Sequence, residues 1–78
     1  MPNMPVVTAK ALLEYLLKYG CTLTSVKGSH FKVENTKNGR RAPIPVHGKR
    51  DISSSFSKSI LNQLGIDIDD FIEFIRKN

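Results

Sequence analysis

The sequence predicts an α+β domain in which helices cover one face of a three-stranded antiparallel sheet. A helical repeat of apolar residues comes first, a β-prone stretch divided by two turn signals follows, and two shorter helical repeats end the chain. Because such a small sheet needs helices on its apolar face only, we expect its other face to be exposed. A length of 78 residues allows one small domain, which we assign to residues 1–78.

The first predicted helix begins after Thr8 and ends at Gly20. Residues 1–7 contain two prolines, and we expect them to form a loose lead-in. Thr8 is a suitable N-cap, and Gly20 is a suitable residue just past the C-terminus. Between them the apolar side chains recur at intervals of three and four residues, as in a helix with one buried stripe. These side chains are Ala9, Leu12, Leu13, Leu16 and Leu17.

Three strands are predicted to follow as an antiparallel meander. β-branched residues favour a strand over residues 21–27, and Gly28-Ser29 then turns the chain into a second strand over residues 30–35. Asn38-Gly39 favours a type I′ hairpin turn into a third strand, which covers residues 41–46.

The third strand contains two prolines, Pro43 and Pro45, which lack backbone N–H groups on the same side of the strand. A central strand does not tolerate this loss, so we expect the third strand to lie at the sheet edge with its prolines outward. Its inward face then carries Ala42, Ile44 and Val46.

Two helices are predicted to close the chain. Serines at positions 53–55 offer N-caps for a helix that ends at Gly65, with Ile60, Leu61 and Leu64 on its apolar side. Asp67 offers an N-cap for a short final helix. The apolar stripe of this last helix contains Ile68, Phe71, Ile72 and Ile75.

Charge and cysteine content narrow the class of protein. Residues 1–50 contain nine Lys or Arg and two acidic residues, whereas residues 51–78 contain three Lys or Arg and five acidic residues. This basic half favours a polyanionic ligand, with nucleic acid first and an acidic protein second, although a merely solvated basic face gives the same pattern. Cys21 is the single cysteine, so no intramolecular disulfide can form, and we expect its thiol to be buried. The sequence shows neither a secretory signal nor an apolar run long enough to span a membrane, so we expect a cytoplasmic protein.

The second predicted strand carries the candidate reactive group, His30. Alternation places Phe31 and Val33 toward the core, so His30 and Lys32 share the exposed face. A histidine can move a proton near neutral pH beside a phosphate held by a cation. On spacing alone, an ordinary strand histidine is the alternative.

Several short pieces of the chain form a recognisable set by their order and spacing. They are Lys18-Tyr19-Gly20, Gly28-Ser29-His30, Gly39-Arg40, Ile44-Pro45-Val46-His47 and Ile60-Leu61-Asn62-Gln63-Leu64-Gly65-Ile66. Together they resemble the HicA (YcfA-like) family of toxins from bacterial toxin–antitoxin pairs, and the resemblance covers nearly the whole chain from Thr8 onward.

The resemblance implies a double-stranded-RNA-binding-domain-like fold: a helix, a three-stranded antiparallel meander and a helix, here with an additional short C-terminal helix. It implies an mRNA endonuclease (mRNA interferase) that acts without the ribosome and is neutralised by a HicB-like antitoxin. The histidine of the Gly-Ser-His motif, here His30, is the implied catalytic residue. One departure is Ser55-Phe56-Ser57, where the family usually has Gly-Thr-Leu.

Cleavage of RNA without a metal uses the 2′-hydroxyl as nucleophile and needs proton transfer and charge stabilisation. Beside His30, we therefore consider cations and hydroxyls near the turn and in the third strand. Lys27 and Lys32 are candidates for charge stabilisation, Arg40 and Arg41 for phosphate binding, and Ser29 for a phosphate hydrogen bond or only a turn. His47 is either the complementary acid, a substrate contact or an ordinary loop histidine. We expect no metal ion or other cofactor, because no ligand cluster accompanies the histidines.

The leading hypothesis is thus an mRNA-cleaving toxin, monomeric alone and part of a hetero-oligomer with its antitoxin. The first alternative is a non-catalytic RNA-binding module of similar fold. Such modules usually have a lysine cluster at the start of the last helix, where this chain has Ser53-Ser54-Ser55-Phe56-Ser57-Lys58. A pure protein-interaction domain is the other alternative, and it leaves the basic face unexplained.

Overall fold

A computed structural model describes residues 5–46 and 51–77 of the chain. Its elements, in order, are β1 (Val7–Thr8), α1 (Ala9–Tyr19), β2 (Cys21–Lys27), β3 (His30–Asn35), β4 (Arg40–Pro45), β5 (Asp51–Ile52), α2 (Ser54–Leu64) and α3 (Ile68–Lys77). Strands β2, β3 and β4 form an antiparallel meander with β3 in the centre. The predicted α+β class and the helix–meander–helix order are confirmed.

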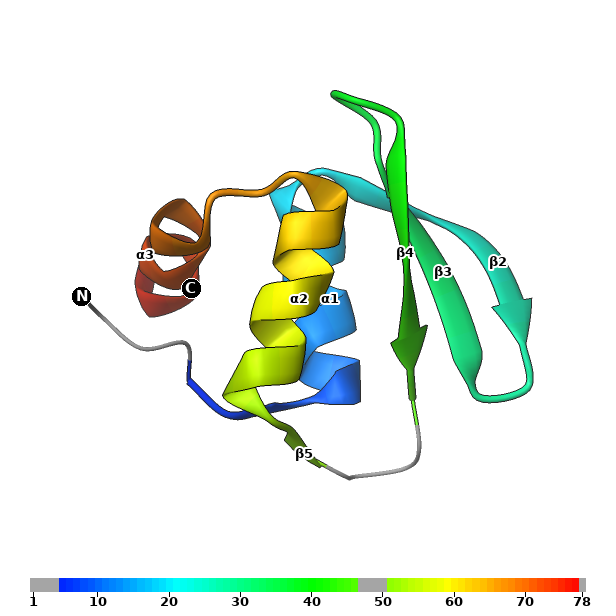
Figure 1. Ribbon diagram of the computed structural model, residues 1–78, viewed down its shortest axis with the longest axis horizontal. Helices are drawn as coiled ribbons and strands as arrows, with labels where there is room; N and C mark the ends of the chain where they lie inside the picture. Colours follow the sequence, from blue (N-terminus) through cyan, green and yellow to red (C-terminus); the bar gives the residue numbers. More distant parts are fainter. Residues whose placement is uncertain (1–4, 47–50, 78) are drawn as a thin grey trace.

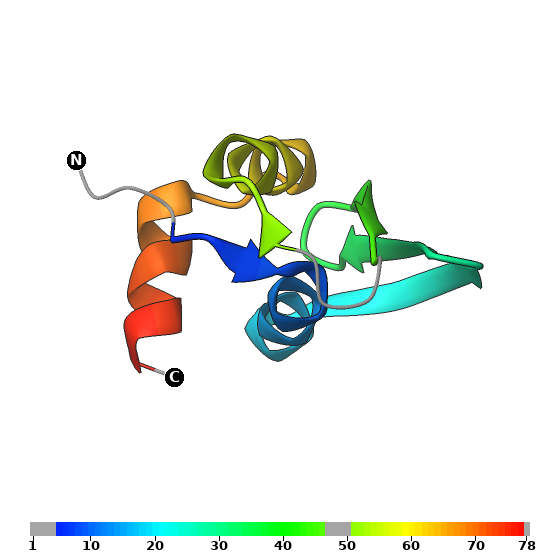
Figure 2. The ribbon, with the colours of Figure 1, turned by 90° about the horizontal axis from the view of Figure 1, so that it is seen from below.

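The molecule has three layers. The helices α1 and α2 both lie between the sheet and α3 (Figures 1 and 2), which leaves the other face of the sheet without a covering element in the described part of the chain. We call this the open face. The core lies between the sheet and the helices, and its fully buried side chains include Leu12, Leu16, Val33, Ile44, Ile60, Leu61, Leu64 and Phe71.

The helix ends follow the capping residues in the sequence. The Thr8 side chain accepts a hydrogen bond from the Ala11 N–H, and Gly20 ends α1 with its own N–H on Leu16 O. Ser53 caps α2 in the same way. At the start of α3, the Asp67 carboxylate accepts from the Asp70 N–H at 3.1 Å. Local chemistry therefore fixes where each helix begins.

The apolar stripe of α1 is narrower than predicted. Ala9, Leu12 and Leu16 are buried, and Leu13 is half-buried, but Leu17 remains 41% exposed. Leu17 therefore lies at the margin of the buried stripe.

Strand β4 is at the sheet edge, as its prolines predict. The Val46 N–H points toward β3, because it donates to Ser29 O at 2.7 Å. Alternate backbone nitrogens of a strand point in opposite directions, so the nitrogens of Pro43 and Pro45 face away from the sheet. This edge offers no N–H donor at either position. The strand covers Arg40–Pro45 and so begins one residue earlier than predicted.

The β3–β4 turn corrects one prediction. A type I′ turn needs positive φ at Asn38, but among the described residues only glycines have positive φ, and Gly39 is one of them. Instead, Asn35 O accepts from the N–H groups of both Asn38 and Gly39 in a four-residue loop. The Asn38 side chain explains the difference: its amide donates to Leu64 O of α2, and its oxygen accepts from the Arg40 N–H.

A second, two-stranded sheet was not predicted. Val7, which we expected in the loose lead-in, pairs with Ile52, and Thr8 pairs with Asp51. Strands β1 and β5 are only two residues long, and such a short strand leaves no periodic pattern in a sequence. Their pairing brings the starts of α1 and α2 together.

The final helix α3 packs on α1 through aromatic rings. Phe71 is fully buried and meets the Tyr19 ring edge-on at a centroid distance of 5.6 Å, while Phe74 meets the same ring at 5.5 Å. Burial, followed by the nearby carboxylates of Asp70 and Asp67, raises the pKa of Tyr19. The tyrosine therefore serves packing between helices.

Candidate functional site

His30 is the first residue of β3 and lies on the open face. Its neighbours in the strand, Phe31 and Val33, are half-buried and fully buried on the helix side, whereas His30 and Lys32 are exposed. The structure thus confirms the alternation that we predicted for this strand. The two-residue turn just before His30 places it at the start of the strand, and Gly28 allows this turn because it adopts a φ of 56°.

Lysines flank His30 in two directions. Lys27 is its direct register partner on β2, and directly paired residues have Cβ atoms about 5 Å apart on the same face. Lys32 is two residues further along β3, about 7 Å away by the rise of a strand. Among the described residues, neither lysine forms an ion pair. We call Lys27, His30 and Lys32 the His30 cluster.

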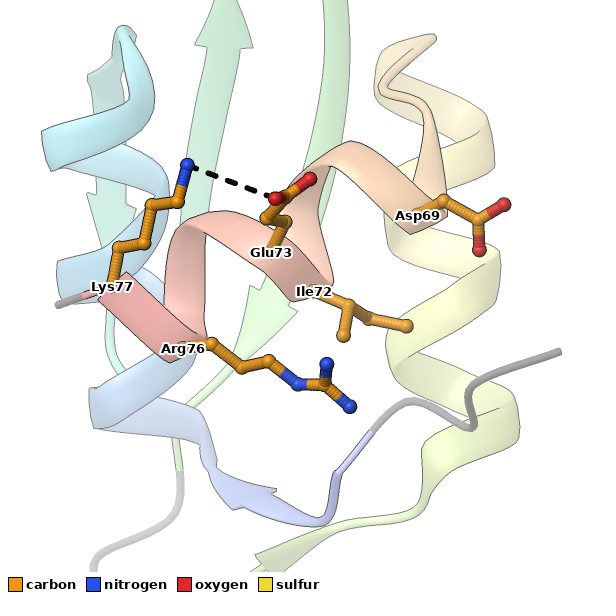
Figure 3. A pocket seen from close by; sticks show the side chains of 5 residues that line it. All are labelled: Asp69, Ile72, Glu73, Arg76 and Lys77. Carbon is orange, nitrogen blue, oxygen red and sulfur yellow. Dashed lines mark ion pairs between the residues drawn. The ribbon is translucent and has the colours of Figure 1, made fainter.

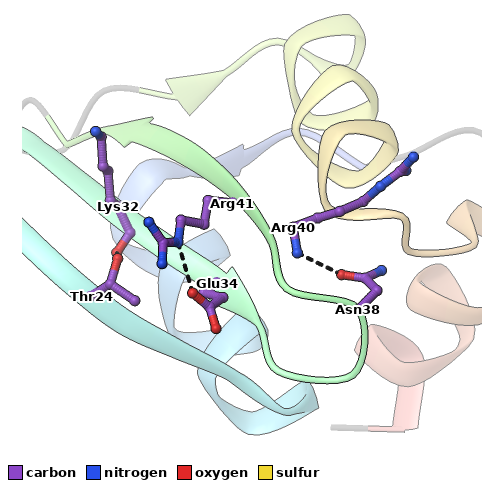
Figure 4. Close-up of polar contacts among 6 residues, drawn as sticks. All are labelled: Thr24, Lys32, Glu34, Asn38, Arg40 and Arg41. Atoms are coloured by element: carbon purple, nitrogen blue, oxygen red, sulfur yellow. Dashed lines mark hydrogen bonds and ion pairs between the residues drawn. The ribbon is translucent and has the colours of Figure 1, made fainter.

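Two hydrogen bonds to backbone carbonyls hold the His30 cluster in place. The Ser29 carbonyl accepts from Val46 N–H, which ties the β2–β3 turn to the end of β4. The Thr24 hydroxyl donates to Lys32 O at 3.3 Å (Figure 4). Thr24 lies where the register of β2 shifts between Leu23 and Ser25, as in a β-bulge. Ser29 thus lies in the turn, and its carbonyl links that turn to the end of β4.

Arg41 also lies on the open face, but it is paired. Its Nε donates to the Glu34 carboxylate at 2.7 Å, and Glu34 is its register partner on β3 (Figure 4). The Arg41 side chain is 67% exposed, so it remains reachable from solvent while it is paired. Glu34 is a residue that our sequence analysis did not consider. Its place two residues before the hairpin loop and opposite an arginine was the available signal.

Arg40 lies apart from the His30 cluster. Its register partner is the buried Asn35, so Arg40 begins on the helix side of the sheet, and it pairs at the opposite end of β3 from His30. Figure 4 shows its side chain directed toward α2, where Nη1 lies 3.5 Å from Asn62 O. A guanidinium there complements the negative C-terminal end of the helix dipole. The structure therefore does not bring Arg40 and Arg41 to one phosphate-binding surface.

His47 lies outside the described residues, and so do the neighbouring Lys49 and Arg50. Among the described residues, no group of three or more His, Cys, Asp or Glu side chains has the arrangement of a metal site. No helix in the described ranges is long and apolar enough to cross a membrane.

A pocket on α3 offers no competing site. It is lined by Asp69, Ile72, Glu73, Arg76 and Lys77 (Figure 3), all from the layer farthest from the sheet. Its charges are of both signs, and Lys77 and Glu73 approach each other at 3.7 Å. The exposed imidazole, with a lysine on either side of it, lies instead in the His30 cluster.

The chemistry available to the His30 cluster is proton transfer next to a bound anion. An exposed imidazole can accept or donate a proton near neutral pH, and two ammonium groups within reach of it attract a phosphate. Because no described element covers the open face, a bound anion can reach the His30 cluster from solvent.

Known proteins resemble this chain over most of its length. Residues 9–66 match the family described as the HicA toxin of bacterial toxin–antitoxin systems. Over 52 residues, the chain is 38% identical to a probable mRNA interferase HicA of Pseudomonas fluorescens (strain Pf0-1), an alignment that covers 67% of this chain and 83% of the relative. No solved structure matches the chain. The family match contains α1, the whole meander and α2, and it ends before α3.

Proposed function

We infer the function of this chain from the premise that it belongs to the HicA family of toxins from bacterial toxin–antitoxin systems. The protein is the toxin of such a system, and it acts as an endoribonuclease that cleaves mRNA. Its relative in Pseudomonas fluorescens carries the name of this activity. The observation that supports placing this activity on the open face is that His30 is exposed there, between Lys27 and Lys32.

In the proposed reaction, the 2′-hydroxyl of the RNA attacks the adjacent phosphorus. The His30 imidazole takes the hydroxyl proton as the new P–O bond forms. Lys27 and Lys32 stabilise the additional negative charge of the phosphorane. The bond to the 5′ oxygen then breaks and leaves a 2′,3′-cyclic phosphate and a 5′-hydroxyl. Two groups are candidates for donating the proton to the 5′ oxygen: His47, and His30 itself once it is protonated.

The other candidate residues take different roles in this proposal. Arg41 binds a flanking phosphate when it shifts from Glu34 to the RNA, because its own side chain is exposed on the open face. Arg40 contributes to the basic surface from the helix side, away from the reacting phosphate. Ser29 shapes the turn before His30.

The proposal includes a partner. A HicB-like antitoxin neutralises the toxin by covering the open face, and the chain alone is a cytoplasmic monomer. A covered open face excludes RNA from His30 without any change in the fold. A marginal core of this size also gains stability from a bound partner.

The test of the toxin assignment is expression in bacterial cells without an antitoxin. The parent chain should arrest growth, whereas His30→Ala should not, at equal soluble levels of the two proteins. Because His30 is exposed, its replacement should leave the circular dichroism spectrum and melting temperature unchanged. Normal growth with the soluble parent chain would contradict the assignment, as would growth arrest of equal strength by the variant.

A further inference from the structure

The two edges of the sheet differ in their ability to accept another strand. At β4, Pro43 and Pro45 present no N–H group outward, so this edge is closed to pairing. Strand β2 forms the opposite edge, contains no proline and is seven residues long. Among the described residues, no strand pairs with its outer side. Strand β2 is therefore the edge on which a further strand can add.

The helix-side face of β2 is apolar and exposed. The bulge at Thr24 puts Leu23 and Val26, three positions apart, on the same face, because their register partners are Val33 and Phe31. Leu23 is 41% and Val26 is 51% exposed. The β2–β3 hairpin extends beyond the helices that cover the rest of the sheet (Figure 1), which fits the exposure of these two residues.

The open-face side of β2 is basic at its C-terminal end. Ser25 and Lys27 point there, next to their register partners Lys32 and His30 on β3. Neither lysine forms an ion pair with a described residue. A strand added to β2 would thus have an apolar neighbour on one face and ammonium groups on the other.

We propose that the free edge of β2 receives an extended strand of a partner protein whose side chains alternate between apolar and acidic residues. Its backbone completes the hydrogen bonds of β2, its apolar side chains cover Leu23 and Val26, and its carboxylates pair with Lys27 and Lys32. The charge of the lysines selects an acidic strand over a second copy of this chain, whose net charge is +5. This inference rests on the proposed function for the identity of the partner, which is the antitoxin.

The proposal gives the partner a direct route to inhibition. Carboxylates that neutralise Lys27 and Lys32 would lie beside His30, where the phosphate of the RNA has to bind. The same two lysines then serve the substrate and the inhibitor, and occupation by one excludes the other.

The experiment is a titration of the isotope-labelled full chain with a synthetic peptide of about ten residues in which Val and Glu alternate, followed by amide chemical shifts and hydrogen exchange. Shift changes should concentrate on β2, with slower exchange of its outward amides and weaker binding at high salt. Val26→Lys should weaken binding by about tenfold or more. The matched control is Phe56→Lys, since Phe56 is 43% exposed but lies on α2, and its affinity should equal that of the parent.

A peptide that alternates Val and Lys should not bind. Equal binding of this basic peptide would overturn the proposal. So would an acidic peptide that produces no change at millimolar concentration, or whose shift changes fall on β4 or α3. Equal affinity of Val26→Lys and Phe56→Lys for the acidic peptide would also overturn it. RNA cleavage by the free chain is measured separately. Cleavage without peptide binding would refute this inference alone, and peptide binding without cleavage would refute only the proposed function.

Discussion

Replacing Gly65 by alanine tests the contact that fixes the β3–β4 hairpin to the C-terminus of α2. Gly65 has a φ of 71°, and a Cβ built there would lie 2.6 Å from Asn38 Nδ2. The Asn38 amide can turn away, but it then loses its hydrogen bond to Leu64 O, which is worth about 1 kcal/mol. The left-handed conformation costs alanine about 1 kcal/mol or more in addition. We expect a loss of about 2–3 kcal/mol in the free energy of unfolding.

The matched control is Gly39→Ala. Gly39 has a φ of 75°, nearly that of Gly65, but a Cβ there meets no atom within 4 Å. Urea denaturation should therefore show a loss of about 1 kcal/mol for Gly39→Ala and about 1 kcal/mol more for Gly65→Ala. In an Asn38→Ala background, the additional loss from Gly65→Ala should shrink, since the same hydrogen bond cannot be lost twice. Equal losses for the two glycine variants would refute the role of the Asn38 contact.

Three further outcomes follow from the structure. Lys27→Ala and Lys32→Ala should each lower the rate of RNA cleavage by about threefold to tenfold and reduce the salt dependence of that rate. Lys37→Ala on the hairpin loop should change neither. Equal effects of all three variants would show that only the overall positive charge matters. Ser57→Ala should raise the free energy of unfolding by about 1 kcal/mol, because the Ser57 hydroxyl is fully buried and has no hydrogen-bond partner among the described residues. A lower free energy of unfolding for this variant, measured by urea denaturation, would contradict the prediction. Burial raises the pKa of the Cys21 thiol above its ordinary value of 9.0. The unfolded chain therefore loses this proton at lower pH than the folded chain, and the free energy of unfolding should fall as the pH rises above 9.0. A Cys21→Ala variant whose free energy of unfolding falls equally steeply with alkaline pH would contradict this.

Elements with local signals could be predicted from the sequence. Caps at Thr8, Ser53 and Asp67 and glycines at the helix ends place the three helices, because these contacts involve only neighbouring residues. Alternation in β3 predicts the exposed His30 for the same reason. The family resemblance, and not the spacing, is what gives this histidine a chemical role.

Features that depend on distant contacts could not be predicted. The turn at Asn38 takes its form from Leu64, which is 26 residues away, and the same end of α2 draws Arg40 to the helix side. The short β1–β5 pairing depends on two segments that are adjacent only in the folded chain. The bulge in β2 did leave a local signal. From Ser25 to Val26 the alternation of polar and apolar residues breaks, so that Leu23 and Val26 are three apart.

The measurement that tests the central claim most directly is the single-turnover rate of cleavage of a mixed-sequence single-stranded RNA in excess EDTA, with the end groups of the products determined. We expect fragments that end in a 2′,3′-cyclic phosphate, and a rate at least about a hundredfold lower for His30→Ala, since loss of a proton-transfer group has an effect of this size. The same oligonucleotide with 2′-deoxy sugars should remain intact. Tight binding without cleavage by either protein would contradict the claim and favour a non-catalytic RNA-binding module. Equal rates for the parent and His30→Ala would remove the histidine from the reaction.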